Sequence, residues 1–131
     1  MKRILLIDDE DINLFIIQNL IRLSGIEAEV IFFSSCQKGI DYVKQLIDND
    51  EEMPDLILLD IDMPVMTGWD FLDKYRNFNE KKKRETVLKI FTTSIIETDI
   101  QKAKEYPDID GYLNKPMTID MIRKIEADHF N

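Results

Sequence analysis

Four short segments of the chain end in, or carry, side chains that could bind a cation and a phosphoryl group. The apolar run ILLI is followed by Asp8 and Asp9, and the run LILL is followed by Asp60. The run VLKIF is followed by Thr92, and the segment GYLNKP contains Lys115. Ligands of open α/β sheets bind beyond the carboxyl ends of the strands. We therefore expect carboxylates, a hydroxyl and an ammonium group to meet at one sheet edge, a set that suits a divalent cation and a phosphoryl group.

Strand-like and helix-like segments alternate along the chain and would position these residues. Continuous apolar runs predict buried strands at Arg3–Ile7, Glu29–Phe33, Leu56–Leu59, Val87–Phe91 and Gly111–Leu113. Helical spacing of apolar residues predicts helices at Ile12–Ser24, Gln37–Ile47, Gly68–Tyr75, Thr98–Glu105 and Ile119–Ala127. Five β–α repeats predict an α/β fold with a doubly wound, five-stranded parallel sheet. Right-handed crossovers then bring the carboxyl ends of all strands to one edge.

The composition agrees with a single domain that spans residues 1–131. The chain is 44% apolar with only 4 Gly and 4 Pro, enough for one core and without a low-complexity tract. It has no apolar run of the roughly 20 residues needed to cross a membrane, and its start turns acidic too early for a signal peptide. The single cysteine, Cys36, suits a cytoplasmic protein without disulfides.

The charge of the chain bears on its partners. A formal net charge of −9 argues against DNA as the main partner, because phosphate contacts need basic surface. The basic run KKKR at residues 81–84 precedes the fourth predicted strand. We expect it to be a solvated loop at the opposite edge of the sheet from the acidic residues.

Taken in this order, the motifs resemble the response-regulator receiver domains of two-component signalling over nearly the whole chain. They are the pair Asp8-Asp9, LILLDIDMPVMTG with Asp60, Pro64 and Gly68, IFTTS with Thr92, and GYLNKP with Tyr112, Lys115 and Pro116. The chain departs from the family pattern at Val65, where glycine or asparagine is often found, while Asp62 and Thr93 occupy variable positions. The resemblance implies a flavodoxin-like (βα)5 receiver fold. It also implies a phosphoacceptor domain that assists its own phosphorylation and dephosphorylation, and not an enzyme.

The resemblance assigns roles to the acidic residues. Asp60 would be the phosphoacceptor, a carboxylate nucleophile that forms an acyl phosphate. Asp8, Asp9, Asp60 and the backbone carbonyl of Asp62 would bind Mg²⁺ or Mn²⁺, and Mg²⁺ prefers an octahedral shell of oxygens. Without the metal these carboxylates repel one another, so we expect at least one of them to have a raised pKa.

The resemblance also assigns the phosphoryl-binding and switch residues. Thr92, Lys115 and the backbone N–H of Met63 would contact phosphoryl oxygens. Tyr112 would turn from an exposed to a buried rotamer when Thr92 moves toward the phosphoryl group. We expect a cis peptide bond before Pro116, against a base rate of about 5–6% for such bonds.

The first predicted helix has apolar side chains on opposite faces. At about 100° per residue, the face expected to pack on the sheet carries Ile16, Ile17 and Leu20. The opposite face carries Ile12, Phe15 and Leu23. The resemblance implies that this second face docks on the helical bundle of a histidine kinase. The alternative is an ordinary apolar surface without a function.

The implied partners are a histidine kinase or histidine phosphotransfer protein, and a protein target that binds according to phosphorylation. With no output domain predicted, the protein would act through such binding or as a phosphate sink, as a monomer or a weak phosphorylation-dependent dimer. Two alternatives remain. Asp60-Ile61-Asp62 also resembles the D-x-D motif of haloacid-dehalogenase-like phosphatases, although the acidic pair precedes it here. A receiver-fold interaction module without phosphorylation would be expected to lack Asp60, Lys115 or the metal carboxylates.

Overall fold

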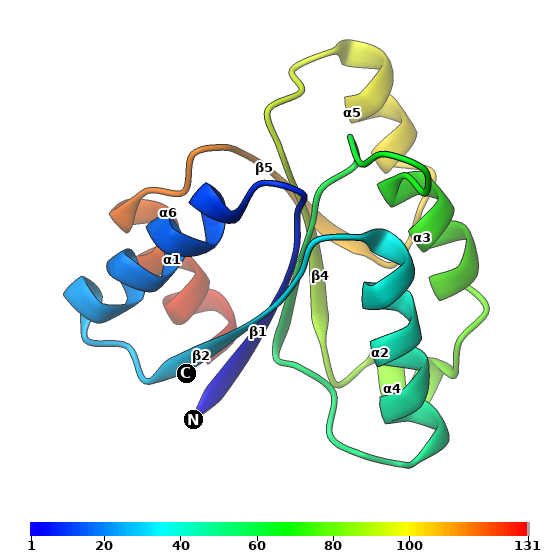
Figure 1. Cartoon of the computed structure of the whole chain (residues 1–131), viewed down its shortest axis with the longest axis horizontal. Helices are drawn as coiled ribbons and strands as arrows, with labels where there is room; N and C mark the ends of the chain where they lie inside the picture. Colours follow the sequence, from blue (N-terminus) through cyan, green and yellow to red (C-terminus); the bar gives the residue numbers. More distant parts are fainter. Residues whose placement is uncertain (131) are drawn as a thin grey trace.

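The computed structural model describes residues 1–130, in which helices cover both faces of a parallel sheet (Figure 1). The strands are β1 Lys2–Ile7, β2 Ala28–Phe33, β3 Leu56–Leu59, β4 Val87–Thr92 and β5 Ile109–Asn114. All neighbouring strands are parallel, in the order β2-β1-β3-β4-β5. The order reverses between β1 and β3, and the crevice at such a switch point is where ligands of open α/β sheets bind.

The helices divide between the two faces of the sheet. They are α1 Asp11–Ser24, α2 Cys36–Asp48, α3 Gly68–Tyr75, α4 Glu80–Lys83, α5 Glu97–Ala103 and α6 Ile119–Ile125, followed by a π-helical turn, Glu126–Phe130. α1 and α6 pack together on one face, and α2 and α3 pack together on the other (Figure 1). Among residues 1–130, no helix is long and apolar enough to span a membrane.

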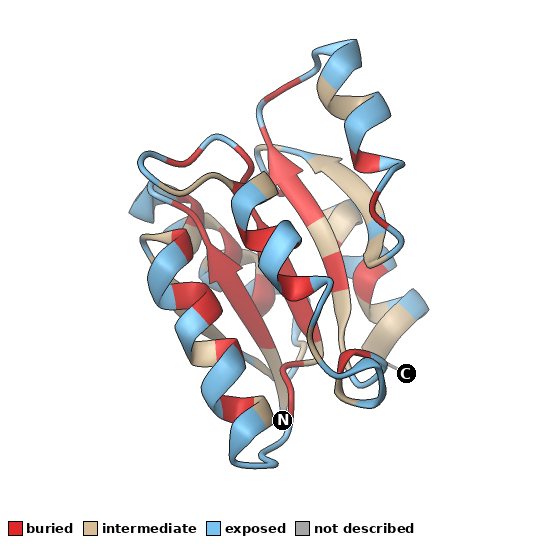
Figure 2. Ribbon diagram, turned by 90° about the vertical axis from the view of Figure 1, so that its right-hand side faces the viewer, coloured by how far each residue is buried: buried red, intermediate tan, exposed pale blue. Residues whose placement is uncertain are grey.

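The core consists of two apolar layers, one on each side of the sheet. Successive side chains of a strand point to opposite faces, so Leu5 and Ile7 of β1 join the layer under α2 and α3. Ile4 and Leu6 join the layer under α1 and α6. Figure 2 shows the central strands buried along most of their length and the helices buried only on their inner sides. This two-sided burial is why the central strands read as continuous apolar runs.

The structure confirms the predicted sheet and the five predicted helices, with small shifts at their ends. No end shifts by more than two residues: α5 spans Glu97–Ala103 where the pattern predicted Thr98–Glu105, and β5 begins at Ile109 where it predicted Gly111. Local caps set several of the starts: the Ser35 hydroxyl accepts a hydrogen bond from the backbone N–H of Lys38 at the start of α2. Thr67 and Asp70 form a reciprocal capping box at the start of α3.

The prediction of a solvated loop at residues 81–84 is wrong. Asn79 caps the single turn of α4 through the backbone N–H of Lys82. Lys83 is buried, and its ammonium lies 3.1 Å from Asp108 and 2.8 Å from Glu80. An acid 25 residues further along the chain therefore satisfies this lysine, which a local basic pattern does not reveal.

Candidate functional site

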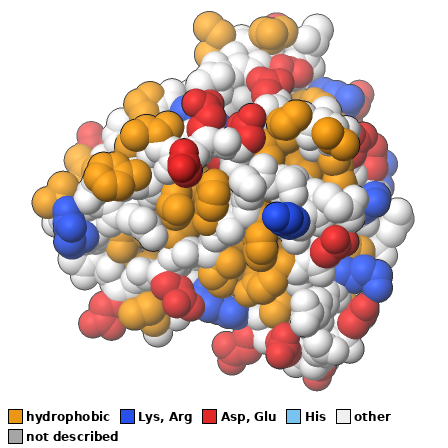
Figure 3. Space-filling model, in the orientation of Figure 1, with side chains coloured by type: hydrophobic (Ala, Val, Ile, Leu, Met, Phe, Trp, Pro, Cys, Tyr) orange, Lys and Arg blue, Asp and Glu red, His pale blue; other side chains and the backbone are white. Residues whose placement is uncertain are grey.

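Three carboxylates meet at the switch point of the sheet. Asp8 follows β1 and Asp60 follows β3, and the backbone N–H of Asp60 donates to the Ile7 carbonyl at 3.0 Å, which joins the two strand ends. Asp8 and Asp60 are buried, whereas Asp9 is exposed. Each of the three aspartates offers one oxygen within 4.8 Å of the others. Figure 3 shows acidic side chains gathered where the carboxyl ends of the strands meet. Hard carboxylate oxygens at this spacing suit a divalent cation.

One lysine lies between two of these carboxylates. The Nζ atom of Lys115 is 2.6 Å from Oδ2 of Asp8 and 2.8 Å from Oδ2 of Asp60. The lysine side chain is only 5% exposed. Its backbone N–H donates to the Thr92 carbonyl at 2.9 Å, which ties the loop after β5 to the end of β4. The Lys115–Pro116 peptide bond is cis, as the resemblance implied.

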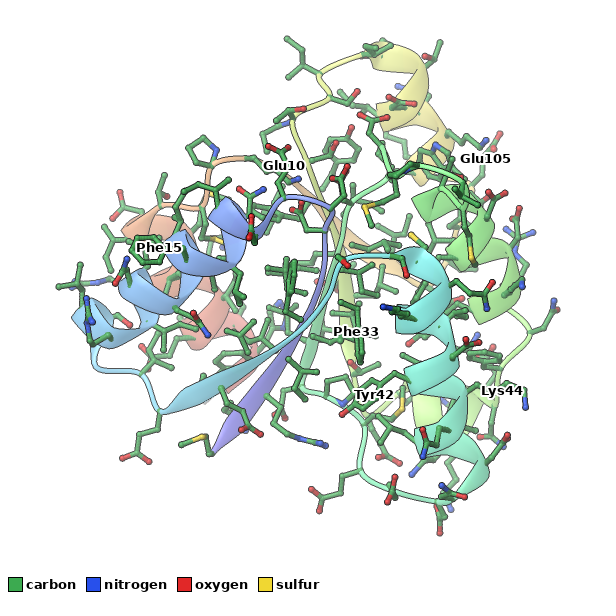
Figure 4. The ribbon with its side chains drawn as sticks, in the orientation of Figure 1. Glu10, Phe15, Phe33, Tyr42, Lys44 and Glu105 are labelled. Atoms are coloured by element: carbon green, nitrogen blue, oxygen red, sulfur yellow. The ribbon has the colours of Figure 1, made fainter. Side chains whose placement is uncertain are left out.

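Backbone and amide donors hold the two buried carboxylates from their other sides. The backbone N–H of Asp62 donates to Oδ1 of Asp60 at 2.9 Å. The backbone N–H of Glu10 donates to Oδ1 of Asp8 at 2.9 Å, and Nδ2 of Asn13 donates to Oδ2 of Asp8 at 3.1 Å. Figure 4 shows Glu10 where the chain passes from β1 into α1. Both carboxylates are thus oriented by contacts from residues close in the chain, which the loops after β1 and β3 and the first turn of α1 provide.

The pKa shifts follow from burial and from these contacts. Burial raises the pKa of Asp8 more than the hydrogen bonds from Lys115 and from Glu10 lower it. Repulsion from Asp60 contributes least, so the expected rise is present at Asp8 but burial, and not repulsion, is its main cause. Burial alone would lower the pKa of Lys115, but its bonds to Asp60 and Asp8 raise it above the ordinary value. The ammonium therefore stays charged at neutral pH.

Thr92 ends β4 inside a small hydrogen-bonded network. Thr92 is fully buried, and its hydroxyl oxygen accepts from the backbone N–H of Ser94 at 3.2 Å. The Ser94 carbonyl accepts from the Tyr112 hydroxyl at 3.0 Å and from Nδ2 of Asn114 at 2.9 Å. The Ser94 hydroxyl donates to Asp99 of α5 at 2.6 Å. Thr92 is thus connected through Ser94 to both β5 and α5.

This network corrects one prediction and adds two residues. Tyr112 was expected to start from an exposed rotamer, but its ring is partly buried against the core and its hydroxyl is bonded. Ser94 and Asn114 were not singled out from the sequence. Asn114 ends β5 and Ser94 lies two residues beyond β4, and polar residues at such positions are too common to identify a site without the contacts between them.

The structure places the three predicted docking residues on the surface of α1. Phe15 is 62% exposed and lies on the outer side of the helix (Figure 4), and Ile12 and Leu23 are also exposed. On the opposite face Ile17 is buried, while Ile16 and Leu20 are partly buried. That face also carries a buried polar residue that was not predicted, Asn13.

The backbone of the loop between β3 and α3 restricts which residue types fit at two motif positions, Gly68 and Val65. A Cβ on Gly68 would lie 2.6 Å from the Asp60 carbonyl oxygen and 2.7 Å from Cα of Ile61, so only glycine allows α3 to begin against the backbone of Asp60 and Ile61. Val65 has a φ of 65°, in the left-handed region that glycine and asparagine adopt more readily. This conformation accounts for the residue types often found at this position.

Comparison with known proteins identifies the family. The sequence matches the response regulator receiver domain over residues 4–126. The chain belongs to this receiver family. It is 30% identical over 123 residues, 94% of its length, to hybrid signal transduction histidine kinase G of Dictyostelium discoideum, and spans only 3% of that protein.

Solved receivers share the fold. A two component response regulator from Cytophaga hutchinsonii has a TM-score of 0.84 and 26% identity, with 97% of this chain and 95% of that chain covered. The Mn(2+)-bound form of response regulator Rcp1 has a TM-score of 0.78 and 26% identity, with 98% and 94% covered. The protein is therefore a receiver domain with an acidic pocket formed by Asp8, Asp9 and Asp60, able to bind a metal. Receivers pair with histidine kinases and accept phosphoryl groups, and they are not conventional enzymes.

Proposed function

We propose that this receiver domain acts as a response regulator that accepts a phosphoryl group on Asp60. The donor would be a histidine kinase or a histidine phosphotransfer protein, and the product would signal through altered binding to a protein target. The observation that carries the proposal is the juxtaposition of Asp60 with Lys115 at 2.8 Å, beside the carboxylates of Asp8 and Asp9. This set supplies a nucleophile, a cation for phosphoryl oxygens and oxygen ligands for a metal.

The chemistry is a transfer between two nucleophiles. A carboxylate oxygen of Asp60 attacks phosphorus, a P–O bond forms, and the P–N bond of the phosphohistidine breaks with its electron pair returning to the imidazole. Lys115 neutralises charge on the phosphoryl oxygens. The Thr92 hydroxyl oxygen accepts from Ser94, which leaves its own proton free to donate to the phosphoryl group.

The residues fit a magnesium ion. Three carboxylates face one ammonium group, so the pocket keeps an excess of negative charge and offers hard oxygen donors. Asp8, Asp9 and Asp60 would hold the ion, together with the Asp62 carbonyl that the family resemblance implies. When bound, Mg²⁺ supplies positive charge for the phosphoryl oxygens during transfer. Mn²⁺ has similar ligand preferences.

The site is tested by labelling with acetyl phosphate. We expect intact-mass spectrometry to show one added phosphoryl group in the wild type with Mg²⁺, and none after chelation or in Asp60→Asn. Asp62→Asn is the matched control, because Asp62 is exposed and contributes only backbone groups to the site. Equal labelling of Asp60→Asn and wild type would contradict the proposal. Loss of labelling in Asp62→Asn would instead favour the D-x-D phosphatase chemistry. Membership of the receiver family does not support that alternative.

The exposed face of α1 is proposed as the kinase-docking surface. It carries Ile12, Phe15 and Leu23, which are 54%, 62% and 72% exposed and lie on the helix that follows Asp8. Phe15→Ala is expected to slow phosphotransfer from the cognate kinase while labelling by acetyl phosphate stays normal. Ile96→Ala, an exposed apolar change on a different element, serves as the control. An unchanged rate of phosphotransfer to Phe15→Ala would contradict the proposal that α1 docks on the kinase.

Phosphorylation would be read out through Ser94. When Thr92 moves toward the phosphoryl group, the bond from the Ser94 N–H changes, and Tyr112, Asn114 and Asp99 are bonded to the same residue. The proposed target surface therefore lies over α5, β5 and α6. A shift in populations requires that the phosphoryl group interact differently with the two states. NMR signals of Tyr112 that are identical with and without beryllofluoride and Mg²⁺ would show that the signal takes another route.

A further inference from the structure

Asn13 is a polar residue on the buried side of α1. It is 6% exposed and stands four residues before Ile17, which itself stands four before Ile21, so the three share the face that packs on the sheet. A polar group inside such an interface is costly unless it is hydrogen-bonded. The hydrogen-bond partner of Asn13 therefore indicates why asparagine, and not an apolar residue, occupies the first of these three buried positions.

The partner is a carboxylate of the acidic pocket. Nδ2 of Asn13 donates to Oδ2 of Asp8 at 3.1 Å, in a bond that is buried on both sides. The same oxygen accepts from Lys115 at 2.6 Å, and the Glu10 N–H donates to Oδ1 at 2.9 Å. The Asn13 N–H also donates to the Glu10 carbonyl at 3.2 Å, so the first turn of α1 and the Asp8 side chain are held by the same residue.

Two side chains, Lys115 and Asn13, donate to Oδ2 of Asp8, and they differ in charge and in whether they also contact Asp60. Lys115 is shared with Asp60, and in the proposed function its ammonium serves the phosphoryl group as well. Its charge also opposes a cation at the pocket. The Asn13 amide is neutral, lies on the helix face that packs on the sheet, and donates to Asp8 and not to Asp60. Neutral donors that orient a ligating group without opposing the metal are typical of the residues that support metal ligands.

We propose that Asn13 is a positioning residue for Asp8, which keeps this carboxylate directed toward Asp9 and Asp60 for metal binding. The proposal rests on the proposed function for the identity of the metal. It does not require Asn13 to touch the ion or the reacting atoms. It predicts a defect in Mg²⁺ affinity that excess Mg²⁺ overcomes, because the phosphoacceptor and the phosphoryl-binding groups remain intact.

The test is calorimetric titration of Asn13→Leu with Mg²⁺. Leucine is close to asparagine in size and suits the buried face of α1, so we expect the variant to fold and its Kd for Mg²⁺ to rise about tenfold. Asn19→Leu is the matched control, since Asn19 lies on the same helix and its amide oxygen accepts from Arg22 and not from the pocket. Asn13→Gln, which retains an amide donor, should regain part of the affinity. If Asn13→Leu does not fold, Asn13→Ala is measured in its place.

A second readout separates positioning from a general loss of structure. With acetyl phosphate as donor, the labelling rate of the Asn13 variant should be low at limiting Mg²⁺ and reach that of the wild type at saturating Mg²⁺. An unchanged Kd, or an equal loss in Asn19→Leu, would overturn the proposal. If the wild type itself neither binds Mg²⁺ nor is labelled, the proposed function fails; if the wild type does both and the Asn13 variant matches it, only this inference fails.

Discussion

At the residue scale, the acidic pocket combines burial with incomplete charge balance. The ammonium of Lys115 contacts two buried carboxylates, Asp8 and Asp60, and a third carboxylate lies beside them at the surface. Removing one partner of a buried ion pair leaves an uncompensated charge. The negative charges of Asp60 and Asp9 also act on the thiol of Cys36, at the start of α2.

Cys36 is expected to be unreactive in the folded protein. Burial, followed by the charges of Asp60, Asp70 and Asp9, raises the pKa of its thiol from 9.0 to about 12. At pH 8 only about one thiol in ten thousand would be ionised. Iodoacetamide should therefore label Cys36 in denaturant but not in the native state, as followed by mass spectrometry.

The raised pKa of Cys36 also makes the stability of the protein depend on pH. Above pH 9.0 the unfolded thiol ionises while the folded thiol keeps its proton, so the free energy of unfolding should fall as the pH rises from 9.0 toward 12. Cys36→Ala should show a weaker decline over that range. Rapid native-state labelling at pH 8 would show that the thiol is accessible and its pKa ordinary.

Val65 is expected to destabilise the loop that it belongs to. It is a β-branched residue with a φ of 65°, and its side chain is fully exposed, so no packing offsets the backbone cost. Val65→Asn should increase the free energy of unfolding in urea by about 1 kcal/mol. Val65→Ile, which stays β-branched, is the control and should give no gain. Equal stability of Val65→Asn and the wild type would argue against strain at this position.

At the element scale, a buried lysine attaches the short helix α4 to the start of β5. Lys83 donates to the Arg76 carbonyl after α3 at 3.0 Å, and pairs with Asp108 just before β5. Three separate segments thus meet at one ammonium group, at the edge of the sheet opposite the acidic pocket. The pair has a structural role that the phosphoryl chemistry does not involve.

Lys83→Met is expected to lower the free energy of unfolding by about 2 kcal/mol. Breaking a fully buried pair costs about 3–5 kcal/mol, and the cost is smaller here because the Asp108 side chain is 15% exposed to water. Lys81→Met, an exposed change in the same turn, is the matched control and should leave stability unchanged. Similar effects of the two substitutions in urea titrations would show that the buried contacts of Lys83 contribute little. Labelling of Asp60 should stay normal in both variants.

At the scale of the whole molecule, the chain has a net charge of −9, and folding brings three of its carboxylates, Asp8, Asp9 and Asp60, close together. The sheet order puts the ends of β1 and β3 side by side, and the fold holds Asp8 and Asp60 there out of water. A cation that binds the folded chain and not the unfolded chain must then stabilise the fold. Metal binding and global stability are therefore linked.

Mg²⁺ at a hundred times its Kd should stabilise the protein by about 2.7 kcal/mol, which corresponds to roughly 10 °C in Tm for a domain of this size. Burial raises the pKa of Asp8 above 3.8, so protons compete with the metal at a higher pH than at an ordinary carboxyl group. The stabilisation should be full at neutral pH and disappear as the pH falls through that raised pKa. Calorimetric scans with and without Mg²⁺ measure it. Asp9→Asn should lose most of the shift, and an undiminished shift in that variant would place the ion elsewhere.

The sequence by itself determined the fold and the place of the site. Apolar runs that end in Asp8, Asp60 and Thr92 predict strands that deliver these side chains to one edge, and right-handed crossovers leave few other arrangements. The meeting of Lys115 with Asp8 and Asp60 follows from this topology. These predictions succeeded because periodicity and strand ends are local properties of the chain.

Only the tertiary structure determined which polar groups are buried and what they contact. The bond from Asn13 to Asp8 depends on how α1 leaves the sheet, and the burial of Lys83 depends on an acid far along the chain. The Tyr112 hydroxyl reaches the Ser94 carbonyl in the loop after the neighbouring strand β4. Burial and hydrogen bonding depend on the whole set of spatial neighbours. A sequence pattern reports the neighbours along the chain, and the packing of the helices on the sheet supplies the others.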